Sequence, residues 1–371
     1  MGGYDLATWS KESALSRTLA LPALAALALL AGCAAPPPAA TTAPGGTAAP
    51  EQSLECAQMV TNSGGLNDRS FNETSWAGME RAQEEHGVEA NVLVSTTESD
   101  LAPNVQAAVD TGCGFVLTVG FELAAATDEQ AEANPDVQFA IVDEIVEQPN
   151  VRSIVFDTAQ AAFLAGYTAA SVTESGIVAT FGGGNQPPVT LFMDGFAAGI
   201  DAHNEAKGTD VQLLGWDPEA QDGTFTGDFE NVQLGQTQTQ AFIAQGADVI
   251  LPVAGQVGEG SFRASLDAGG TALVIWVDND GYDTLPAEFH PLLLTSVLKN
   301  TEDAVVAAVG DAVDGTISDE PIIGTLENGG VDIAPFHDLD ARVSDETKAE
   351  LEALRQQIIA GEITVESPSS P

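Results

Sequence analysis

Positively charged residues are scarce in this chain of 371 residues. Eleven Lys and Arg stand against 55 Asp and Glu, which gives a formal net charge of −44 at pH 7. A surface this acidic repels nucleic acid, so the sequence argues against binding of DNA or RNA. The hydrophobic content of 44% is nevertheless too high for a disordered chain. We therefore interpret the acidic residues as the solvated surface of a folded protein, either as an adaptation to a saline habitat or as a simple solubility trait.

Sequence patterns of common catalytic and metal sites are also missing. None of the four histidines stands in an H-E-x-x-H pattern or at metal-ligand spacing, and no G-x-S-x-G motif occurs. The Gly-rich stretch 254–260 lacks the Lys-Ser/Thr of a P-loop, and 182–188 lacks the G-x-G-x-x-G spacing of a dinucleotide fingerprint. The sequence thus predicts neither a metal ion nor a cofactor.

No hydrophobic run reaches the length of a transmembrane helix. The longest, "LALPALAALALLA" at 19–31, has 13 residues and fits the apolar region of a signal peptide. It ends in "LAGC", which resembles the lipobox of bacterial lipoproteins. We expect residues 1–32 to be a signal peptide and Cys33 to be acylated, with an ordinary signal peptide as the alternative. The Ala-, Pro- and Thr-rich residues 33–55 then form a flexible tether to the extracytoplasmic face of the cell membrane.

Beyond the tether, short apolar strands alternate with helical segments. Strands this apolar are buried on both faces, as in a parallel sheet with helices on either side. Two series of such strands predict an α/β fold of two doubly wound parallel-sheet lobes. The first series comprises 57–62, 90–95, 115–119, 137–142 and 151–156, and the second comprises 176–181, 211–216, 248–253 and 272–277. A further strand is expected at 292–300.

Only three cysteines are present, and two remain once Cys33 is assigned to the lipid. Cys56 precedes the first strand and Cys113 stands two residues before the strand at 115–119. In a doubly wound lobe of order 2-1-3 these strands are neighbours, so both cysteines lie at the same edge of the sheet. We expect a structural disulfide in the oxidising exported setting, with two buried free thiols as the alternative.

Polar and aromatic residues gather where the strands end. Ligands of such sheets bind beyond the C-terminal ends of the strands, where aromatic rings can stack on a planar group and acids or amides can bind its edge. Individually, the aromatics are as compatible with the core and the acids with helix caps, so the prediction depends on their joint position. The candidates are Asn67, Asp68, Trp76, Phe121, Asp143, Gly255, Gln256 and Asp278.

The stretch "GGLNDRSFNETSWAGME" at 64–80 resembles the G-x-x-D-x-S-F-N-x-x-x-W-x-G signature of the basic membrane protein family. These are lipoprotein solute-binding components of ABC importers, including purine-nucleoside receptors. The resemblance continues in order through blocks such as "GGGNQPPVTLFMDGFAAGID" and "QGADVILPVAGQVGEG", and it covers about residues 56–365. It implies a type I periplasmic binding protein fold with three crossovers between the lobes. The expected lobes are 56–157 plus 292–316, and 158–291 plus 317–371.

The resemblance also assigns roles to candidate residues. In nucleoside-binding members, the base is stacked between aromatic side chains of the two lobes. Trp76 falls on the first-lobe aromatic, and Phe225 is the expected second-lobe aromatic, with Phe229 as the alternative. Asn67 and Asp68 fall on the acidic pair of the signature, although many members have Asp at the position of Asn67.

Further acids complete the expected site. Asp278 is expected to accept hydrogen bonds from ribose hydroxyls, and Asp143 matches the Asp of a "FAIVD" block. Gln256 stands where many members have Lys, so it can form hydrogen bonds but brings no charge. The sequence thus predicts a lipid-anchored protein that binds a nucleoside, with a purine as the expected base, and delivers it to an ABC permease. The alternatives are another small solute or a sensor role on the same scaffold, and, less favoured, a nucleoside hydrolase.

Overall fold

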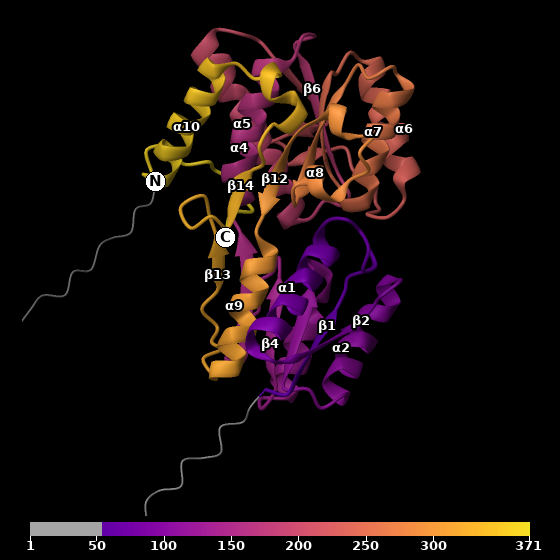
Figure 1. The fold of residues 1–371 in the computed structure, drawn as a ribbon, viewed down its shortest axis with the longest axis vertical. Helices are drawn as coiled ribbons and strands as arrows, with labels where there is room; N and C mark the ends of the chain where they lie inside the picture. Colours follow the sequence, from indigo (N-terminus) through magenta and orange to yellow (C-terminus); the bar gives the residue numbers. More distant parts are fainter. Residues whose placement is uncertain (1–53) are drawn as a thin grey trace, which may run out of the picture. The chain divides into compact units, whose positions relative to one another are not determined.

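The computed structural model describes residues 54–371, which form two lobes, each built around a six-stranded sheet (Figure 1). The expected signal peptide, Cys33 and nearly all of the tether lie outside the described residues. Within the described part, none of the helices combines the length and the apolar character that crossing a membrane requires. The α/β class with parallel sheets is confirmed.

The first lobe contains a sheet in the order β13-β5-β4-β3-β1-β2, in which every neighbouring pair is parallel. All five residues of β3 are buried, as expected for a strand covered on both faces. The strands are β1 (Cys56–Val60), β2 (Glu89–Leu93), β3 (Phe115–Val119), β4 (Gln138–Val142), β5 (Val151–Phe156) and β13 (Ile322–Gly324).

Alternate residues of these strands divide the first core into two layers. Phe115 and Leu117 of β3 join a cluster with residues of α1 (Phe71–His86) and α9 (Thr301–Asp314). Val116, which points to the other face, packs with α2 (Leu101–Asp110), near α3 (Ala124–Ala133). The period of two along a strand thus places one helix pair on each face of the sheet.

The second lobe contains a sheet in the order β14-β12-β11-β10-β6-β7, in which only the β12–β14 pair is antiparallel. Its strands are β6 (Ile177–Gly182), β7 (Gln212–Leu214), β10 (Val249–Val253), β11 (Leu273–Asp278), β12 (Leu293–Lys299) and β14 (Val331–Ile333). A small separate ribbon pairs β8 (Trp216–Asp217) with β9 (Asp222–Gly223).

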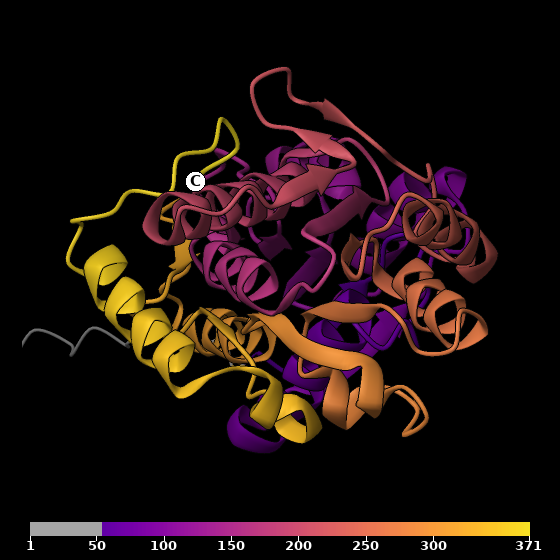
Figure 2. The same ribbon diagram turned by 90° about the horizontal axis from the view of Figure 1, so that it is seen from above.

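The helices of the second lobe surround this sheet, and Figure 2 shows α10 and the α6–α7 pair on opposite sides of it. They are α4 (Thr158–Val172), α5 (Pro187–Lys207), α6 (Val232–Ala244), α7 (Glu259–Asp267), α8 (Gly281–Thr284) and α10 (Asp345–Ile359). The buried helices α4 and α5 touch closely because glycine allows it: a Cβ at Gly199 would lie 2.0 Å from the carbonyl oxygen of Phe163. Short 3₁₀ helices are η1 (Glu98–Asp100), η2 (Phe121–Leu123), η3 (Gly255–Gly258), η4 (His290–Leu292) and η5 (His337–Arg342).

Three crossovers join the lobes, as predicted, but two of them lie later in the chain than expected. The chain leaves the first lobe after β5, returns between β12 and α9, and leaves again between β13 and β14. The expected boundaries at 292 and 316 therefore need correction, because β12 pairs with β11 in the second sheet and β13 pairs with β5 in the first. A strand with two buried faces fits either sheet, so its own residues do not reveal its partner.

Cys56 and Cys113 form a disulfide with a Cα–Cα distance of 5.0 Å. Cys56 begins β1, and Ala57 of that strand pairs with Phe115 of β3. The bond therefore lies at the N-terminal edge of the first sheet. Ligands of such sheets bind at the opposite edge, so the disulfide stands apart from the site described next.

Candidate functional site

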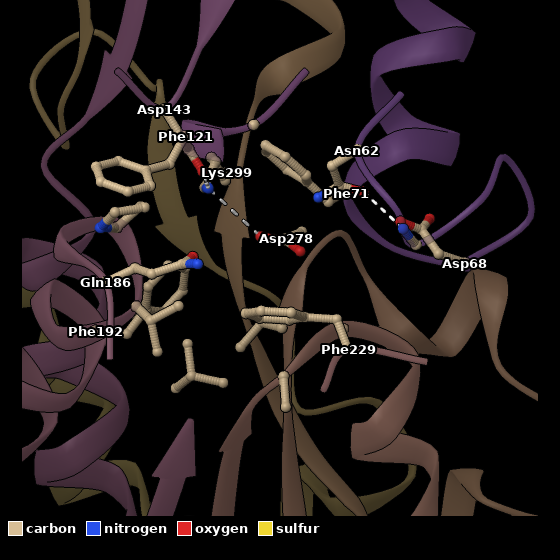
Figure 3. Close-up of a pocket in the computed structure, with 18 of the residues that line it drawn as sticks. Asn62, Asp68, Phe71, Phe121, Asp143, Gln186, Phe192, Phe229, Asp278 and Lys299 are labelled. Atoms are coloured by element: carbon tan, nitrogen blue, oxygen red, sulfur yellow. Dashed lines mark hydrogen bonds and ion pairs between the residues drawn. The ribbon is translucent and has the colours of Figure 1, made fainter. Parts of the chain in front are cut away.

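A cavity lies between the two lobes, beyond the C-terminal ends of several strands (Figure 3). It holds about 640 Å³ of atom-free space, counting the part that is open to solvent. Residues of both lobes contribute to its wall. The lining residues are Asn62, Gly64, Asp68, Phe71, Gly120, Phe121, Glu122, Asp143, Gln186, Pro188, Val189, Phe192, Phe229, Val253, Ala254, Gly255, Gln256, Val277, Asp278 and Lys299.

Four phenylalanines form much of the apolar wall. Phe71 and Phe121 come from the first lobe, and Phe192 and Phe229 come from the second. The ring of Phe229 lies against the backbone at Gly183, where a Cβ would come within 2.3 Å of it, so this position requires glycine. Aromatic rings from both sides suit a ligand with a flat apolar face.

A buried cation, Lys299, lies beside two carboxylates in the cavity wall. Its Nζ is 2.6 Å from Asp143 Oδ2 in the first lobe and 3.7 Å from Asp278 Oδ1 in the second. Burial lowers the pKa of Lys299, but the two carboxylates outweigh it and hold that pKa above its ordinary value. Burial raises the pKa of Asp143, against the opposing effect of Lys299. The Nζ also lies 4.8 Å from the ring centre of Phe71, a cation–π distance.

Asp143 directly follows β4, Asp278 is the last residue of β11, and both have an unusual backbone conformation. Asp143 has φ 70° and Asp278 has φ 71°, in the left-handed region that side chains other than Asn, Asp and Gly seldom adopt. This conformation ends each strand sharply. It also explains why short acids occupy both positions.

Asp68 builds the turn before α1. Its carboxylate accepts hydrogen bonds from the backbone N–H groups of Ser70, Asn72 and Glu73 and from the Asn72 side chain, at 2.8–3.1 Å. Burial raises the pKa of Asp68 to about 6, although the three N–H donors act in the opposite direction. The Asn72 amide also donates to Asn62 Oδ1 at 2.7 Å, and this contact fixes the amide of Asn62 at the cavity wall. Asp68 thus supports the wall chiefly by capping the helix.

Most of the predicted site residues line the cavity. Asp68, Phe121, Asp143, Gly255, Gln256 and Asp278 are all part of the wall. Asn67 is not, because its side chain is exposed in the turn. The predicted residues near strand ends thus reach the cavity wall, because their positions depend mainly on where each strand ends.

The two aromatics that the resemblance pointed to, Trp76 and Phe225, lie outside the cavity wall. Helix α1 begins at Phe71, and the five residues from there to Trp76 turn the side chain by about 140° to another face of the helix, where Trp76 is half-buried against the core. Phe225 packs edge-on against Trp216 at a centroid distance of 6.1 Å. Phe71 and the alternative, Phe229, occupy the wall instead.

Several wall residues were missed by the sequence reasoning. Phe71 belongs to the same signature as Trp76, and Gln186 belongs to the stretch 182–188 after a strand, so both carried a usable signal. Lys299 could also have been predicted, because it is one of only eleven basic residues and stands at the end of a buried strand. Phe192 carried no such signal, because it lies in a helix whose cavity-facing side depends on packing, whereas Glu122 directly follows the predicted Phe121.

The wall is acidic overall. Four carboxylates, from Asp68, Glu122, Asp143 and Asp278, face a single basic residue, Lys299. Such a site favours a neutral or cationic ligand that donates hydrogen bonds over an anionic one. Between residues 54 and 371, no three His, Cys, Asp or Glu side chains are grouped in a way that could hold a metal ion.

Comparison with known proteins identifies the family. Residues 57–369 match the family described as ABC transporter substrate-binding protein PnrA-like, or Bmp. The chain is 30% identical over 362 residues to the ABC transporter nucleoside-binding protein BmpA of Lactococcus lactis subsp. cremoris, covering 93% of this chain and 97% of that one. It is also 30% identical over 278 residues to an uncharacterized lipoprotein of Pyrococcus abyssi, with 72% of this chain and 66% of that one covered.

A solved structure gives the same result. A solute-binding protein of an ABC transporter system from Aeropyrum pernix K1 superposes with a TM-score of 0.74 and 25% identity, over 84% of this chain and 92% of that one. The family consists of binding proteins and not of enzymes. The chain therefore belongs to the Bmp family of PnrA-like ABC transporter substrate-binding proteins.

Proposed function

We propose that this protein captures a nucleoside, with a purine as the expected base, in the cavity between its lobes and delivers it to an ABC permease. The observation that carries the proposal is the cavity wall itself, in which two phenylalanines from each lobe surround a group of buried carboxylates. A nucleoside matches both parts, because its base is flat and apolar on its faces and its ribose carries hydroxyl donors. The name of the Lactococcus lactis relative supports the same ligand class.

The rings and the charged residues of the wall suggest how the ligand is oriented. The base would stack between Phe71 of the first lobe and Phe229 of the second. The ribose hydroxyls would lie beside Lys299, which is next to the Phe71 ring, where Asp143 and Asp278 can accept their hydrogen bonds. Binding would close the lobes around the three crossover segments, and no covalent bond would change. Gln256 would donate or accept a hydrogen bond at the edge of the base.

We further propose that the protein is held on the extracytoplasmic face of the membrane by a lipid on Cys33. The "LAGC" sequence supports this anchor, and relatives named as lipoproteins support it independently. The permease is then reached by a domain on a tether, which keeps the binding lobes close to the membrane surface.

Titration calorimetry on the purified full chain tests the ligand class. Adenosine, guanosine, inosine, uridine and free ribose are compared, and we expect the purine nucleosides to bind best. Phe229→Ala should weaken binding by about tenfold or more, since stacking of a base on an aromatic side chain contributes about 1–3 kcal/mol. Trp76→Ala is the matched control, because it removes a larger aromatic outside the wall, and its affinity should stay unchanged.

Recovery of the ligand after overnight incubation separates binding from hydrolysis. We expect intact nucleoside, whereas free base and ribose would favour the hydrolase alternative. Binding of none of the nucleosides, or an equal loss of affinity in both variants, would contradict the proposal and favour another small solute on the same scaffold.

A further inference from the structure

A short segment of the first lobe, residues 69–74, is bound to the second lobe at several points outside the cavity wall. Arg69 Nη1 donates a hydrogen bond to the carbonyl oxygen of Thr284 at 2.8 Å, and its Nε lies 3.2 Å from Glu259 Oε1. The carbonyl oxygen of Arg69 accepts a hydrogen bond from Asn279 Nδ2 at 2.9 Å. Arg69 thus contacts the opposite lobe through both its side chain and its backbone.

The partners of Arg69 are held in place by their own lobe. The side chain of Glu259 is only 6% exposed and has a second ion pair, to Arg263 on the same helix at 3.6 Å. Asn279 Oδ1 accepts hydrogen bonds from Trp276 Nε1 at 3.2 Å and from Thr284 Oγ1 at 3.0 Å, which directs its Nδ2 toward the first lobe. A buried, pre-oriented acceptor of this kind binds a guanidinium more strongly than an exposed carboxylate does.

The first lobe presents Arg69 in an equally defined way. Its backbone has φ 57°, a left-handed conformation that is uncommon for arginine, and its N–H donates to Glu73 Oε2 at 3.1 Å. Thr74 adds a further contact, since its Oγ1 lies 3.2 Å from Asn279 Nδ2. A strained conformation that is held by local contacts and reaches across an interface is typical of a functional position.

The same contacts reach the proposed ligand site. Asn279 and Thr284 belong to the segment that follows Asp278 and ends with the short helix α8, and Ser70 next to Arg69 donates a hydrogen bond to the Asp278 carboxylate. Closing the segment 69–74 onto residues 279–284 therefore fixes the carboxylate that faces the cavity. On the other flank of the cavity a separate bond joins the lobes, from Gln186 Nε2 to Glu122 Oε1 at 3.0 Å (Figure 3 shows Gln186 and Asp68 on opposite sides).

We propose that Arg69, with Glu259, Asn279 and Thr284, forms a clasp that stabilises the closed lobes independently of the ligand. The chain needs such a clasp because both lobes are acidic and repel each other. The strength of the clasp sets the fraction of closed protein without ligand and the rate at which a captured solute is released. Arg69 thus acts as a positioning residue for the proposed site. The biological purpose of the clasp rests on the proposed capture of a solute.

Hydrogen–deuterium exchange of the full chain without ligand tests the clasp, because it reports on lobe opening whatever the solute is. In Arg69→Gln we expect faster exchange in the clasp peptides, near 69–76 and 278–285, and also on the opposite flank, near 120–124 and 183–189. Arg69→Lys, which keeps the charge but loses the guanidinium fork, should give an intermediate effect. Arg263→Gln is the matched control, since it removes the other partner of Glu259 within one lobe, and its exchange should match the wild type.

The outcomes decide between a clasp and a local contact. Faster exchange confined to the peptides around Arg69, or an equal effect in the Arg263 variant, would overturn the proposal. With a bound solute, Arg69→Gln should raise the dissociation rate by about fivefold or more, within the usual range of coupling between sites. If no nucleoside binds, the proposed ligand class fails, while the exchange result on the unliganded protein still stands.

Discussion

Lys299 is the residue on which the charge balance of the cavity depends. Its side chain is 4% exposed, and it lies between carboxylates of the two lobes in a chain that has few cations. A buried charge is tolerated only with partners, and here the two acids and the lysine provide one another with them. The trio thus contributes to the fold as well as to the proposed site.

Replacing Lys299 with methionine should destabilise the protein by about 3–5 kcal/mol, the usual cost of leaving buried charges without their partner. Thermal denaturation followed by circular dichroism measures the loss. Lys348→Met is the matched control: Lys348 pairs with Asp340, whose side chain is 65% exposed, so its loss should cost less than about 1 kcal/mol. Similar effects of both variants would show that the buried trio has no special role.

The pH dependence of the stability of the Lys299→Met variant should show whether the unpaired carboxylates cause the destabilisation. Lys299 lowers the pKa of Asp143, so its removal raises the folded-state pKa of this acid further above the unfolded value of about 3.9. A folded-state pKa above the unfolded value means that the folded protein binds the proton more tightly. The variant should therefore regain stability as the pH falls toward about 4. A loss of stability that is independent of pH would indicate that the variant loses side-chain packing and not a charge interaction.

At the scale of single residues, the sequence predicted those site positions that depend on strand ends. Asp143 and Asp278 follow apolar strands, so the end of each strand was enough to place them. Trp76, which the resemblance assigned to the first-lobe aromatic, lies outside the cavity wall, because five helical residues turn it by about 140° from Phe71. Phe229 lies in a connection with little regular structure, and no periodicity predicts where such a side chain points.

At the scale of elements, the longer strands were predictable, whereas two of the short edge strands were not. The strands expected at 115–119 and 151–156 match β3 and β5, because short segments rich in β-branched and aromatic residues give a clear signal. The edge strands β13 and β14 have three residues each and were not predicted. The sheet to which β12 belongs was also missed, since pairing of parallel strands depends on contacts far apart in the sequence.

The disulfide between β1 and the turn before β3 is expected to stabilise the first lobe without affecting the ligand. It closes a loop with a sequence separation of 57 residues, which corresponds to about 4 kcal/mol in the chain-entropy model. Replacing both cysteines with alanine should lower the melting temperature of the exported protein. Nucleoside affinity should stay the same, because the bond lies at the sheet edge away from the cavity.

Mass spectrometry of the non-reduced, alkylated protein provides the direct check of this bond. Alkylation of both Cys56 and Cys113 in the exported wild type would rule the disulfide out. A loss of affinity in the double variant at a temperature where it remains folded would show instead that the edges of the sheet are coupled.

For the whole molecule, the surplus of acid over base sets the surface chemistry. Two of the eleven basic residues, Lys11 and Arg17, precede residue 54, and each of the other nine forms at least one ion pair. Within residues 54–371 every Lys and Arg is therefore already engaged with an acid. Most of the remaining carboxylates face water and one another, so their mutual repulsion is unscreened at low salt.

This balance predicts that salt stabilises the protein. Added salt weakens the ion pairs, which lowers stability, but it also screens the repulsion among a much larger number of acids. With 55 acids against 11 bases the second effect should prevail, so the melting temperature should rise from dilute buffer at pH 7 to about 1 M KCl, where the Debye length is about 3 Å. The control is the same series near pH 4, where many carboxyls are neutral and the rise should shrink. A melting temperature that stays constant or falls at pH 7 would show that repulsion among the acids contributes little to stability. An equal rise at both pH values would show that the rise comes from non-specific effects of the salt.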